Sequence, residues 1–396
     1  MSTRFEPTQD MSHAQLEINR LHSRIESILA NAKTRLVAAE QQRMASGVIE
    51  LRMSLDVTSL SYVERRAYLD DIFIEYPYLQ MLKARVQKCH EEGLFVRAFS
   101  SKEPTCIFIA GESNTGKSAL MDSYEREFRR IYQGEHTVVP ILPVVLPYPA
   151  SPKSVAINLL KKLGDPNAER GSTAILSSRV ADYIRDCRVE LIVLDELHHF
   201  ISRENHRVLE SVAEWLKTLI IETKVPVIAL GKPTAAAVLD YDEQLRRRFS
   251  ERYSLLPFSW DYEDVATMIE FRRFLKALDC RLPLAEASQL GSFDVAQRIH
   301  YATDGIVGYV VTLISHAADL AIGDGQERIT LGHLSRAFLD RIKTVKPKKE
   351  NPFLLETLDP EQVVMLRKTD IEEDLSSRQQ STKKGRKARA SEVLRT

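Results

Sequence analysis

Short apolar runs alternate with amphipathic helical patterns through the middle of the chain. The apolar runs are 106–110, 138–146 (interrupted by prolines), 191–194 and 225–230. The helical patterns among them begin after the first run and continue at 152–163, 177–186 and 208–222. Strands of this length that alternate with helices are typical of an α/β domain. The pattern therefore predicts a parallel sheet covered by helices on both faces.

Only helical patterns occupy the two flanks of this region. From His13 to about Arg43, apolar residues recur at three- and four-residue steps, which predicts an amphipathic helix that pairs with a partner or docks on its own domain. Two further helices are expected at 62–75, stopped by Pro77, and at 79–93, ending at Gly93. The last patterns are 262–278, 295–303, 308–322 and 331–341. They predict a small helical domain after the sheet.

The segment after the first apolar run has the residues of a phosphate-binding loop. It reads Gly111, Glu112, Ser113, Asn114, Thr115, Gly116, Lys117 and Ser118, and Ala119 continues into the helix. The order strand, loop, helix is the one that this motif requires. Its glycines let backbone N–H groups turn toward phosphate oxygens, where the helix N-terminus adds a partial positive charge. We expect Lys117 to reach the β- and γ-phosphates of ATP and Ser118 to hold Mg²⁺; the alternative is a loop that has lost nucleotide binding.

Two acidic residues, Asp195 and Glu196, follow the buried run 191–194. At the carboxyl end of a parallel strand they suit a metal site, with Asp195 orienting Mg²⁺ and Glu196 polarising the attacking water. The alternative is a pair of carboxylates on a solvated loop. For the next two residues, His198 and His199, a neutral histidine hydrogen-bonded in the turn is favoured over a catalytic role, and no His-x-x-x-His zinc spacing is present.

Composition narrows the class of protein. The 396 residues are 44% apolar and 28% charged, enough for a large core in two or more domains. No run of 18 apolar residues and no signal-peptide core is seen, so a cytoplasmic protein without membrane association is expected. The four cysteines lack the spacing of a zinc site or a disulfide framework. The 55 basic and 55 acidic residues balance, so any nucleic-acid binding must come from a local patch.

Four segments are expected from these patterns. Residues 1–60 form a partly disordered helical extension, 61–258 the nucleotide-binding α/β domain, and 259–345 the helical lid. Residues 346–396 form a largely disordered tail, whose segment 383–389 holds five basic residues and no acid.

A parallel-sheet ATPase followed by a helical lid resembles the AAA+ class, and the chain is most similar to the TniB/TnsC family of transposition regulators. The segments that carry the likeness are 111–118, 195–200, 227–233, 244–249, 304–308 and 351–353. In letters, the more selective ones are Asp-Glu-x-His, a strand ending in Gly-x-Pro, and Gln-Leu-x-x-Arg-Phe. The resemblance spans roughly residues 60–355. Secretion-type ATPases and replication-initiator or helicase-loader ATPases share parts of the set, although the membrane span and the terminal helix-turn-helix expected of them are not seen in the sequence.

The resemblance implies a slow, assembly-dependent ATPase that forms rings or helical filaments on duplex DNA. Such a homo-oligomer connects a target-selection protein, either TniQ-like or a sequence-specific DNA-binding protein, to the transposase, and ATP hydrolysis takes it apart. A scaffold with negligible hydrolysis is the alternative outside the enzyme class.

Two sets of basic residues acquire roles from this resemblance. ATP would lie between subunits, and Arg248 is the candidate arginine finger, with Arg246 and Arg247 as rivals and a solvated helix end as the alternative. Lysines of the helix 152–163 are candidates to line a central pore and contact DNA phosphates; they are Lys153, Lys161 and Lys162. An exposed helix face with ordinary lysines is the alternative.

The sequence departs from the wider AAA+ pattern at two sensor positions. Lys232 stands where a small polar residue is common, and it either touches the γ-phosphate or is exposed, leaving Thr234 as the polar group. The lid segment 304–308 offers no arginine for a second sensor. The missing arginine argues against fast intrinsic turnover.

Overall fold

The computed structural model describes residues 59–100, 102–133, 136–201, 206–356 and 358. Contacts divide these residues into two compact units. The first unit contains 77–113 and 117–255; the second contains the residues up to Tyr76, the short stretch 114–116, and the residues from Leu256 onward. The helix expected at 13–43 and the basic segment 383–389 lie outside the described residues.

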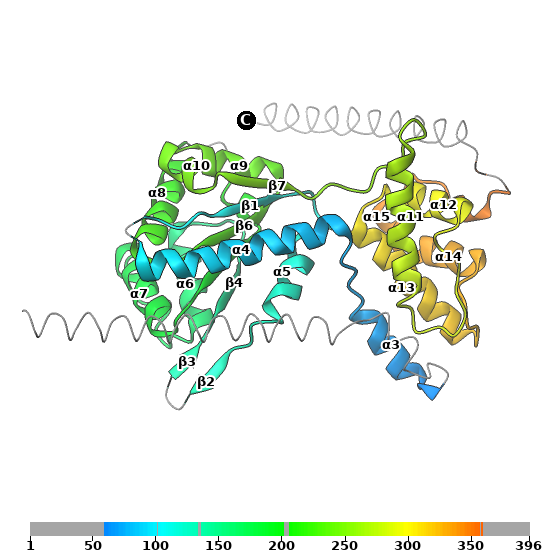
Figure 1. The fold of residues 1–396 in the computed structure, drawn as a ribbon, viewed down its shortest axis with the longest axis horizontal. Coiled ribbons are helices and arrows are strands. Elements are labelled where there is room, and N and C mark those ends of the chain that lie inside the picture. The colour runs from blue at the N-terminus through cyan, green and yellow to red at the C-terminus, as the bar shows by residue number, and fades with distance from the viewer. Residues whose placement is uncertain (1–58, 101, 134–135, 202–205, 357, 359–396) are drawn as a thin grey trace, which may run out of the picture. The chain divides into compact units, whose positions relative to one another are not determined.

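A five-stranded sheet forms the centre of the first unit (Figure 1). Its strands, in spatial order, are β4 (Ile141–Val145), β5 (Leu191–Asp195), β6 (Val227–Gly231), β1 (Ile107–Ala110) and β7 (Glu251–Ser254). All four neighbouring pairs are parallel. The predicted α/β fold with a parallel sheet is therefore confirmed. Because β6 lies between β1 and β5, the carboxyl ends of the two strands that carry the expected site residues meet at the same edge of the sheet.

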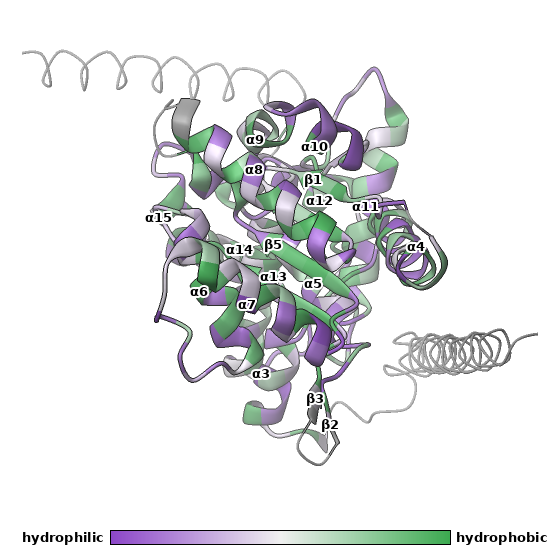
Figure 2. Ribbon diagram, turned by 90° about the vertical axis from the view of Figure 1, so that its left-hand side faces the viewer, coloured by the Kyte–Doolittle hydropathy of each residue, from purple (hydrophilic) through white to green (hydrophobic). Residues whose placement is uncertain are grey.

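Both faces of the sheet are buried, as the apolar runs require. Every residue of β5 is buried, and the strand appears green in the hydropathy view (Figure 2). Alternate residues such as Phe108 and Leu194 join one core with α6 (Pro152–Leu163), α7 (Thr173–Asp186) and α8 (His206–Thr223). The helices α4 (Pro77–Phe99) and α5 (Lys117–Glu125) meet each other through His90, whose Nδ1 lies 3.0 Å from the Tyr124 hydroxyl.

Local signals explain where several helices begin and end. Helix α6 has the bounds expected from the sequence, because Ser151 caps its first turn, Pro152 opens it, and Gly164 ends it in a left-handed conformation at φ 89°. Helix α7 begins four residues before the expected Ser177, because Ser172 accepts a hydrogen bond from the Ile175 N–H and serves as its cap.

Two expectations for α4 were wrong. Pro77 opens this helix instead of stopping the one before it, since proline is accommodated in the first turn. Gly93 lies inside the helix and does not end it. A Cβ on Gly93 would lie 2.4 Å from Cγ of Pro226, so glycine here permits the helix to approach the residue that precedes β6.

The single strand expected at 138–146 is divided. A two-stranded antiparallel hairpin, β2 (Ile131–Gln133) and β3 (His136–Val138), ends before β4 begins at Ile141. Neither this hairpin nor β7 was expected, since three or four residues without a continuous apolar run give little signal. After β6 come a short turn of 3₁₀-helix at Pro233–Ala235, α9 (Ala236–Asp240) and α10 (Glu243–Arg248). Helix α10 is mostly purple in Figure 2 because it holds Glu-Gln-Leu-Arg-Arg-Arg.

All described regular elements of the second unit are helical. They are α3 (Tyr62–Asp70), α11 (Val265–Asp279), α12 (Phe293–Thr303), α13 (Val307–Gly323), α14 (Leu331–Ala337), a π-helical turn at Phe338–Ile342, α15 (Lys343–Val345) and a 3₁₀ turn at Pro352–Leu354. Their shared core includes Phe271, Leu313 and Phe338. The helical lid expected after the sheet is therefore present.

Helix α3 belongs to this second unit, whereas the sequence analysis assigned residues from 61 onward to the nucleotide-binding domain. The guanidinium of Arg65 donates to both carboxylate oxygens of Glu327 at 3.1 Å, and the Tyr62 hydroxyl donates to Asp319 at 2.8 Å. Leu69 enters the helical core. These long-range contacts cannot be read from the helical pattern of 62–75 alone.

Among the described residues, no single helix has both the length and the apolar character to cross a bilayer. The sharply bent pair α12 and α13 meets those criteria only when the two are taken together, and residues of both helices lie in the helical core.

Candidate active site

The phosphate loop connects β1, which ends at Ala110, to α5, which begins at Lys117. Two of its residues adopt left-handed backbone conformations, Asn114 at φ 66° and Gly116 at φ 100°. A side chain at Gly116 would meet no atom within 4 Å, so the positive φ, and not space, favours glycine there. The loop is anchored at its start, because the Gly111 N–H donates to the Gly231 carbonyl at 3.0 Å.

Lys117 points back into this loop. Its ammonium donates to the carbonyl oxygens of Gly111 at 2.7 Å and Glu112 at 2.8 Å, and the residue is buried. Burial lowers the pKa of Lys117, while the nearby charges of Asp195 and Glu196 oppose that shift. A buried ammonium inside a phosphate loop is suited to an anionic ligand, which would replace the two carbonyl oxygens as its partner.

Ser118 and Asp195 lie together although 77 positions separate them. The Ser118 hydroxyl donates to Oδ2 of Asp195 at 2.6 Å, and the Glu196 N–H donates to Oδ1 at 2.7 Å. A hydroxyl and a carboxylate oxygen are the kind of ligand that Mg²⁺ prefers. The chemistry of this donor pair fits Mg²⁺, and Ser118 and Asp195 are the residues that would hold it.

Glu196 follows directly in a left-handed conformation, with φ 62° and ψ 38°, and it directly precedes the 3₁₀ turn Leu197–Phe200 without a side-chain cap hydrogen bond. Its Oε2 lies 3.1 Å from Nδ1 of His198 and 3.8 Å from Nε2 of His199. The three side chains form a compact cluster whose potential ligand atoms lie within 4.8 Å of one another. Neither histidine was expected to take part in the chemistry. Only their spacing, two and three residues after the glutamate in a turn, could have indicated this contact.

Lys232 lies close enough to affect the same groups. Burial is the main cause of the lowered pKa of His198, and the positive charge of Lys232 adds to that effect. The Lys232 charge also acts to lower the pKa of Lys117. Thr234, the other polar residue considered for this position, is exposed.

Arg248 does not offer an accessible guanidinium. Its side chain is buried and forms an ion pair with Glu103, while its Nε and Nη1 atoms have no hydrogen-bond partner among the described residues. A finger that reaches another subunit needs an exposed charge, so this burial weighs against the role predicted for Arg248. Arg246 and Arg247 are exposed on the same helix, and Arg247 pairs with Glu243 at 2.5 Å. No pattern in the residues around Arg248 indicates its contact with Glu103.

The three lysines considered for DNA contact all lie on the exposed side of α6, outside its buried stripe. They are Lys153 near the first turn and Lys161 and Lys162 in the last. Lys161 forms an ion pair with Glu169 at 2.5 Å. This pairing reduces the positive charge that Lys161 can offer to another ligand.

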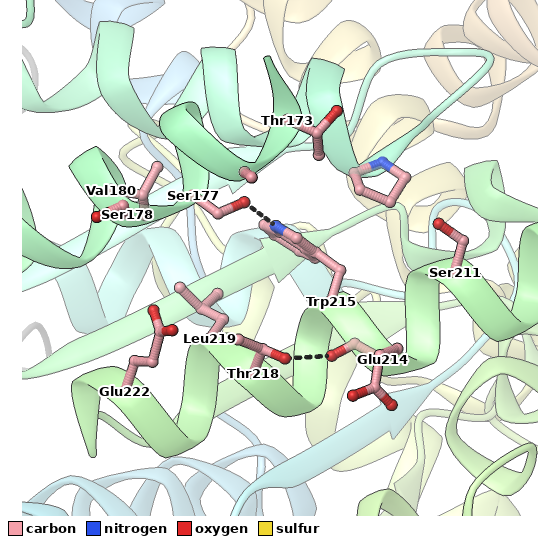
Figure 3. Close-up of a pocket in the computed structure, with 12 residues that line it drawn as sticks. Thr173, Ser177, Ser178, Val180, Ser211, Glu214, Trp215, Thr218, Leu219 and Glu222 are labelled. Atoms are coloured by element: carbon pink, nitrogen blue, oxygen red, sulfur yellow. Dashed lines mark hydrogen bonds between the residues drawn. The ribbon is translucent and has the colours of Figure 1, made fainter. Parts of the chain in front are cut away.

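A separate pocket lies between α7 and α8, beside the start of α6 (Figure 3). Trp215 forms part of its wall, and the indole N–H donates to the Ser177 hydroxyl at 3.1 Å. None of the expected nucleotide-binding or catalytic residues lines this pocket. The phosphate site and this pocket are therefore distinct.

A parallel sheet, a phosphate loop after β1 and an acidic pair after β5 define a P-loop NTPase, and the helical unit that follows places it in the AAA+ class of ATPases. Residues 68–258 match the family model described as "Bacterial TniB protein". The match confirms, over those residues, the resemblance to the TniB/TnsC family. It covers every site residue discussed above.

Solved structures resemble the chain only distantly. The ORC1 protein of Aeropyrum pernix, solved in complex with DNA, is 15% identical with a TM-score of 0.48, over 72% of this chain and 70% of that one. Cdc6p from Pyrobaculum aerophilum is 15% identical with a TM-score of 0.49, over 68% and 69%. No curated protein matches the chain. At these identities and scores, no function is carried from those structures to this chain.

Proposed function

We propose that this protein is an ATP-dependent regulator of DNA transposition. In this proposal it oligomerises on duplex DNA, connects a target-selection protein to a transposase, and is released when it hydrolyses ATP. One observation carries the proposal. The segment that matches the TniB family, 68–258, contains both the phosphate loop and the acidic pair.

The chain's own residues divide the work of hydrolysis. The backbone N–H groups of the loop and the Lys117 ammonium bind the phosphates, and Lys117 exchanges its bonds to the Gly111 and Glu112 carbonyls for bonds to phosphate oxygens. Ser118 and Asp195 would hold Mg²⁺, which would supply neutralisation of phosphate charge. Glu196 orients the attacking water and accepts its proton.

Assembly completes the site in this proposal. An arginine from a neighbouring subunit stabilises the charge that develops on the γ-phosphate, a contribution of about 10³–10⁵ in rate in phosphoryl-transfer enzymes. Exposure favours Arg246 for that role, whereas Arg248 would first have to leave Glu103. Hydrolysis that depends on a neighbour is slow in the free subunit and faster in the assembly.

DNA binding is assigned to the exposed side of α6. Lys153 and Lys162 are exposed there, and lysines contact phosphates independently of base sequence. Since the whole chain carries no net charge, binding depends on this local patch and not on a general positive field. Such binding is reversible when the assembly changes its nucleotide state.

ATP hydrolysis measured with and without duplex DNA tests the enzyme in this proposal. We expect DNA to raise the rate of the wild-type protein, and Glu196→Gln to abolish hydrolysis while ATP binding remains. Glu92→Gln is a matched control, since Glu92 is half exposed and pairs with Lys88 on α4. A protein that binds ATP and DNA but shows no hydrolysis under any condition would leave only the scaffold function.

The transposition role needs its own test. A transposase and a target-selection protein encoded by neighbouring genes should bind the DNA-bound, ATP-loaded form more tightly than the free protein. The amount of each partner captured on immobilised duplex DNA is measured with and without this protein and with each nucleotide. Equal capture of the partners with and without this protein would contradict a connecting role.

A further inference from the structure

The carboxylate of Glu196 is contacted by two histidines from the turn that the glutamate itself begins. Oε2 lies 3.1 Å from Nδ1 of His198 and 3.8 Å from Nε2 of His199. The two imidazole rings also contact each other, with centroids 4.7 Å apart. Glu196 is about one-third exposed, so these rings, and not a surrounding core, restrict its side chain.

His199 is fixed from a different part of the chain. Its Nδ1 lies 2.9 Å from the carbonyl oxygen of Leu146, in the loop after β4. Since a carbonyl only accepts, Nδ1 carries the proton and Nε2 faces Glu196. The Ala150 N–H donates to the His199 carbonyl at 3.3 Å, and the Tyr148 ring meets the imidazole edge-on at 5.5 Å. The loop from Leu146 to Ala150 therefore sets the position of this ring.

His198 has an unused hydrogen-bonding atom directed at the glutamate. Its Nδ1 is buried and has no aligned hydrogen bond among the described residues, although Oε2 of Glu196 lies 3.1 Å away. A small rotation of either side chain would convert this approach into a hydrogen bond from Nδ1–H to Oε2. A buried nitrogen without such a bond carries the desolvation cost of an unpaired polar group, so that rotation is favoured.

A base that activates water must be held accurately. Glutamate has three rotatable side-chain bonds, and a displacement of about 1 Å at a reacting centre lowers rates by roughly 10²-fold. The left-handed backbone of Glu196 fixes the direction of its Cα–Cβ bond but not the rotation of the side-chain bonds beyond it. The two histidines supply the remaining restraint.

We infer that His198 and His199 are positioning residues that hold the Glu196 carboxylate in the orientation for attack on ATP. This inference rests on the proposed ATPase function. His198 acts through its Nδ1 contact, and His199 acts as a spacer braced against the Leu146 carbonyl. Neither histidine exchanges a proton with the substrate in this account.

Steady-state ATP hydrolysis by histidine variants tests this assignment. His198→Ala should lower kcat by about 10- to 100-fold and leave KM and ATP affinity unchanged, because the phosphate loop is intact. His198→Asn should recover most of kcat, since its amide can occupy the place of Nδ1. His199→Ala should also lower kcat. His316→Ala is the matched control, since His316 pairs with Asp340 in the helical unit.

The outcomes separate this inference from the proposed function. If the wild type does not hydrolyse ATP, the proposed function fails. If the wild type hydrolyses ATP, Glu196→Gln stops it, and His198→Ala and His199→Ala keep kcat within about twofold, only the positioning role is overturned. A parallel loss of ATP affinity, or no recovery in a folded His198→Asn variant, would show a structural role and also overturn the inference.

Discussion

Replacing Gly93 with alanine should destabilise the first unit, although alanine is the better helix former. In the structure a Cβ at this position would lie 2.4 Å from Cγ and 2.6 Å from Cδ of Pro226. Real Cβ atoms do not approach carbon so closely, so the helix or the proline must move. Forced overpacking costs about 1–3 kcal/mol. Removal of a helical glycine returns up to about 1 kcal/mol.

Contacts of 2.4 and 2.6 Å place the overpacking in the upper part of that range, at about 2–3 kcal/mol, so the expected net loss is about 1–2 kcal/mol in the free energy of unfolding. Urea denaturation measures it, with fluorescence of Trp215 on α8 as the signal in a Trp260→Phe background. Both the reference and the variant carry Trp260→Phe. For slopes of about 1–3 kcal/mol per molar urea, the transition midpoint should fall by roughly 0.3–2 M.

A second substitution at the point of contact identifies the cause. Pro226→Ala removes Cγ and Cδ, so in its presence Gly93→Ala should cost much less than in the parent chain. Gly323→Ala in α13, where a Cβ would meet nothing within 4 Å, should cause no loss in the helical unit. A Gly93→Ala protein as stable as its parent would refute the packing of α4 described here.

Three further predictions concern the nucleotide site and the surface assigned to DNA. Ser118→Ala should raise the Mg²⁺ concentration needed for hydrolysis by about 10-fold or more, measured by metal titration of the ATPase rate; an unchanged Mg²⁺ dependence would remove Ser118 from the metal site. Arg246→Ala should lower DNA-stimulated hydrolysis by about 10³-fold without changing ATP affinity, whereas Arg248→Ala should mainly lower the melting temperature; the reverse pattern would return the finger role to Arg248. Lys162→Glu should reduce the slope of log affinity for DNA against log salt by about 1, and Lys161→Glu by less because of its ion pair; equal slopes for both variants and wild type would exclude α6 from the interface.

The sequence predicted best the features that depend on neighbouring residues. The phosphate loop, the strand ending at Asp195 and the helix Pro152–Leu163 are encoded by contiguous motifs, apolar runs and caps. The parallel sheet followed from their alternation. The meeting of Ser118 and Asp195 followed in turn, because the carboxyl ends of parallel strands share one edge.

The features that sequence reasoning missed depend on distant partners. The sequence suggests a helix end at Gly93, whereas the structure shows a helical glycine packed against Pro226. Arg248 was the candidate finger, whereas its side chain forms an ion pair with Glu103. Strand β7 alternates half-buried and exposed residues at one border of the sheet, so no apolar run marked it. Helix α3 was expected in the nucleotide-binding domain but belongs to the helical unit. Its partner residue Glu327 lies 262 positions after Arg65, so no local pattern indicates the contact.

The role of the two histidines also required coordinates. In the sequence, His198 and His199 follow an acidic pair that already suffices for water activation. Only the left-handed turn at Glu196 brings the carboxylate back toward them. The bond to the Leu146 carbonyl joins residues 53 positions apart, and no local pattern indicates it.

Sedimentation of the purified protein with long duplex DNA, Mg²⁺ and ATP tests the central claim most directly. The account predicts large DNA-bound oligomers that form with ATP, persist in Glu196→Gln and fail to form in Lys117→Ala. A wild-type protein that stays monomeric with all three components present, or a Lys117→Ala variant that assembles as the wild type does, would contradict it.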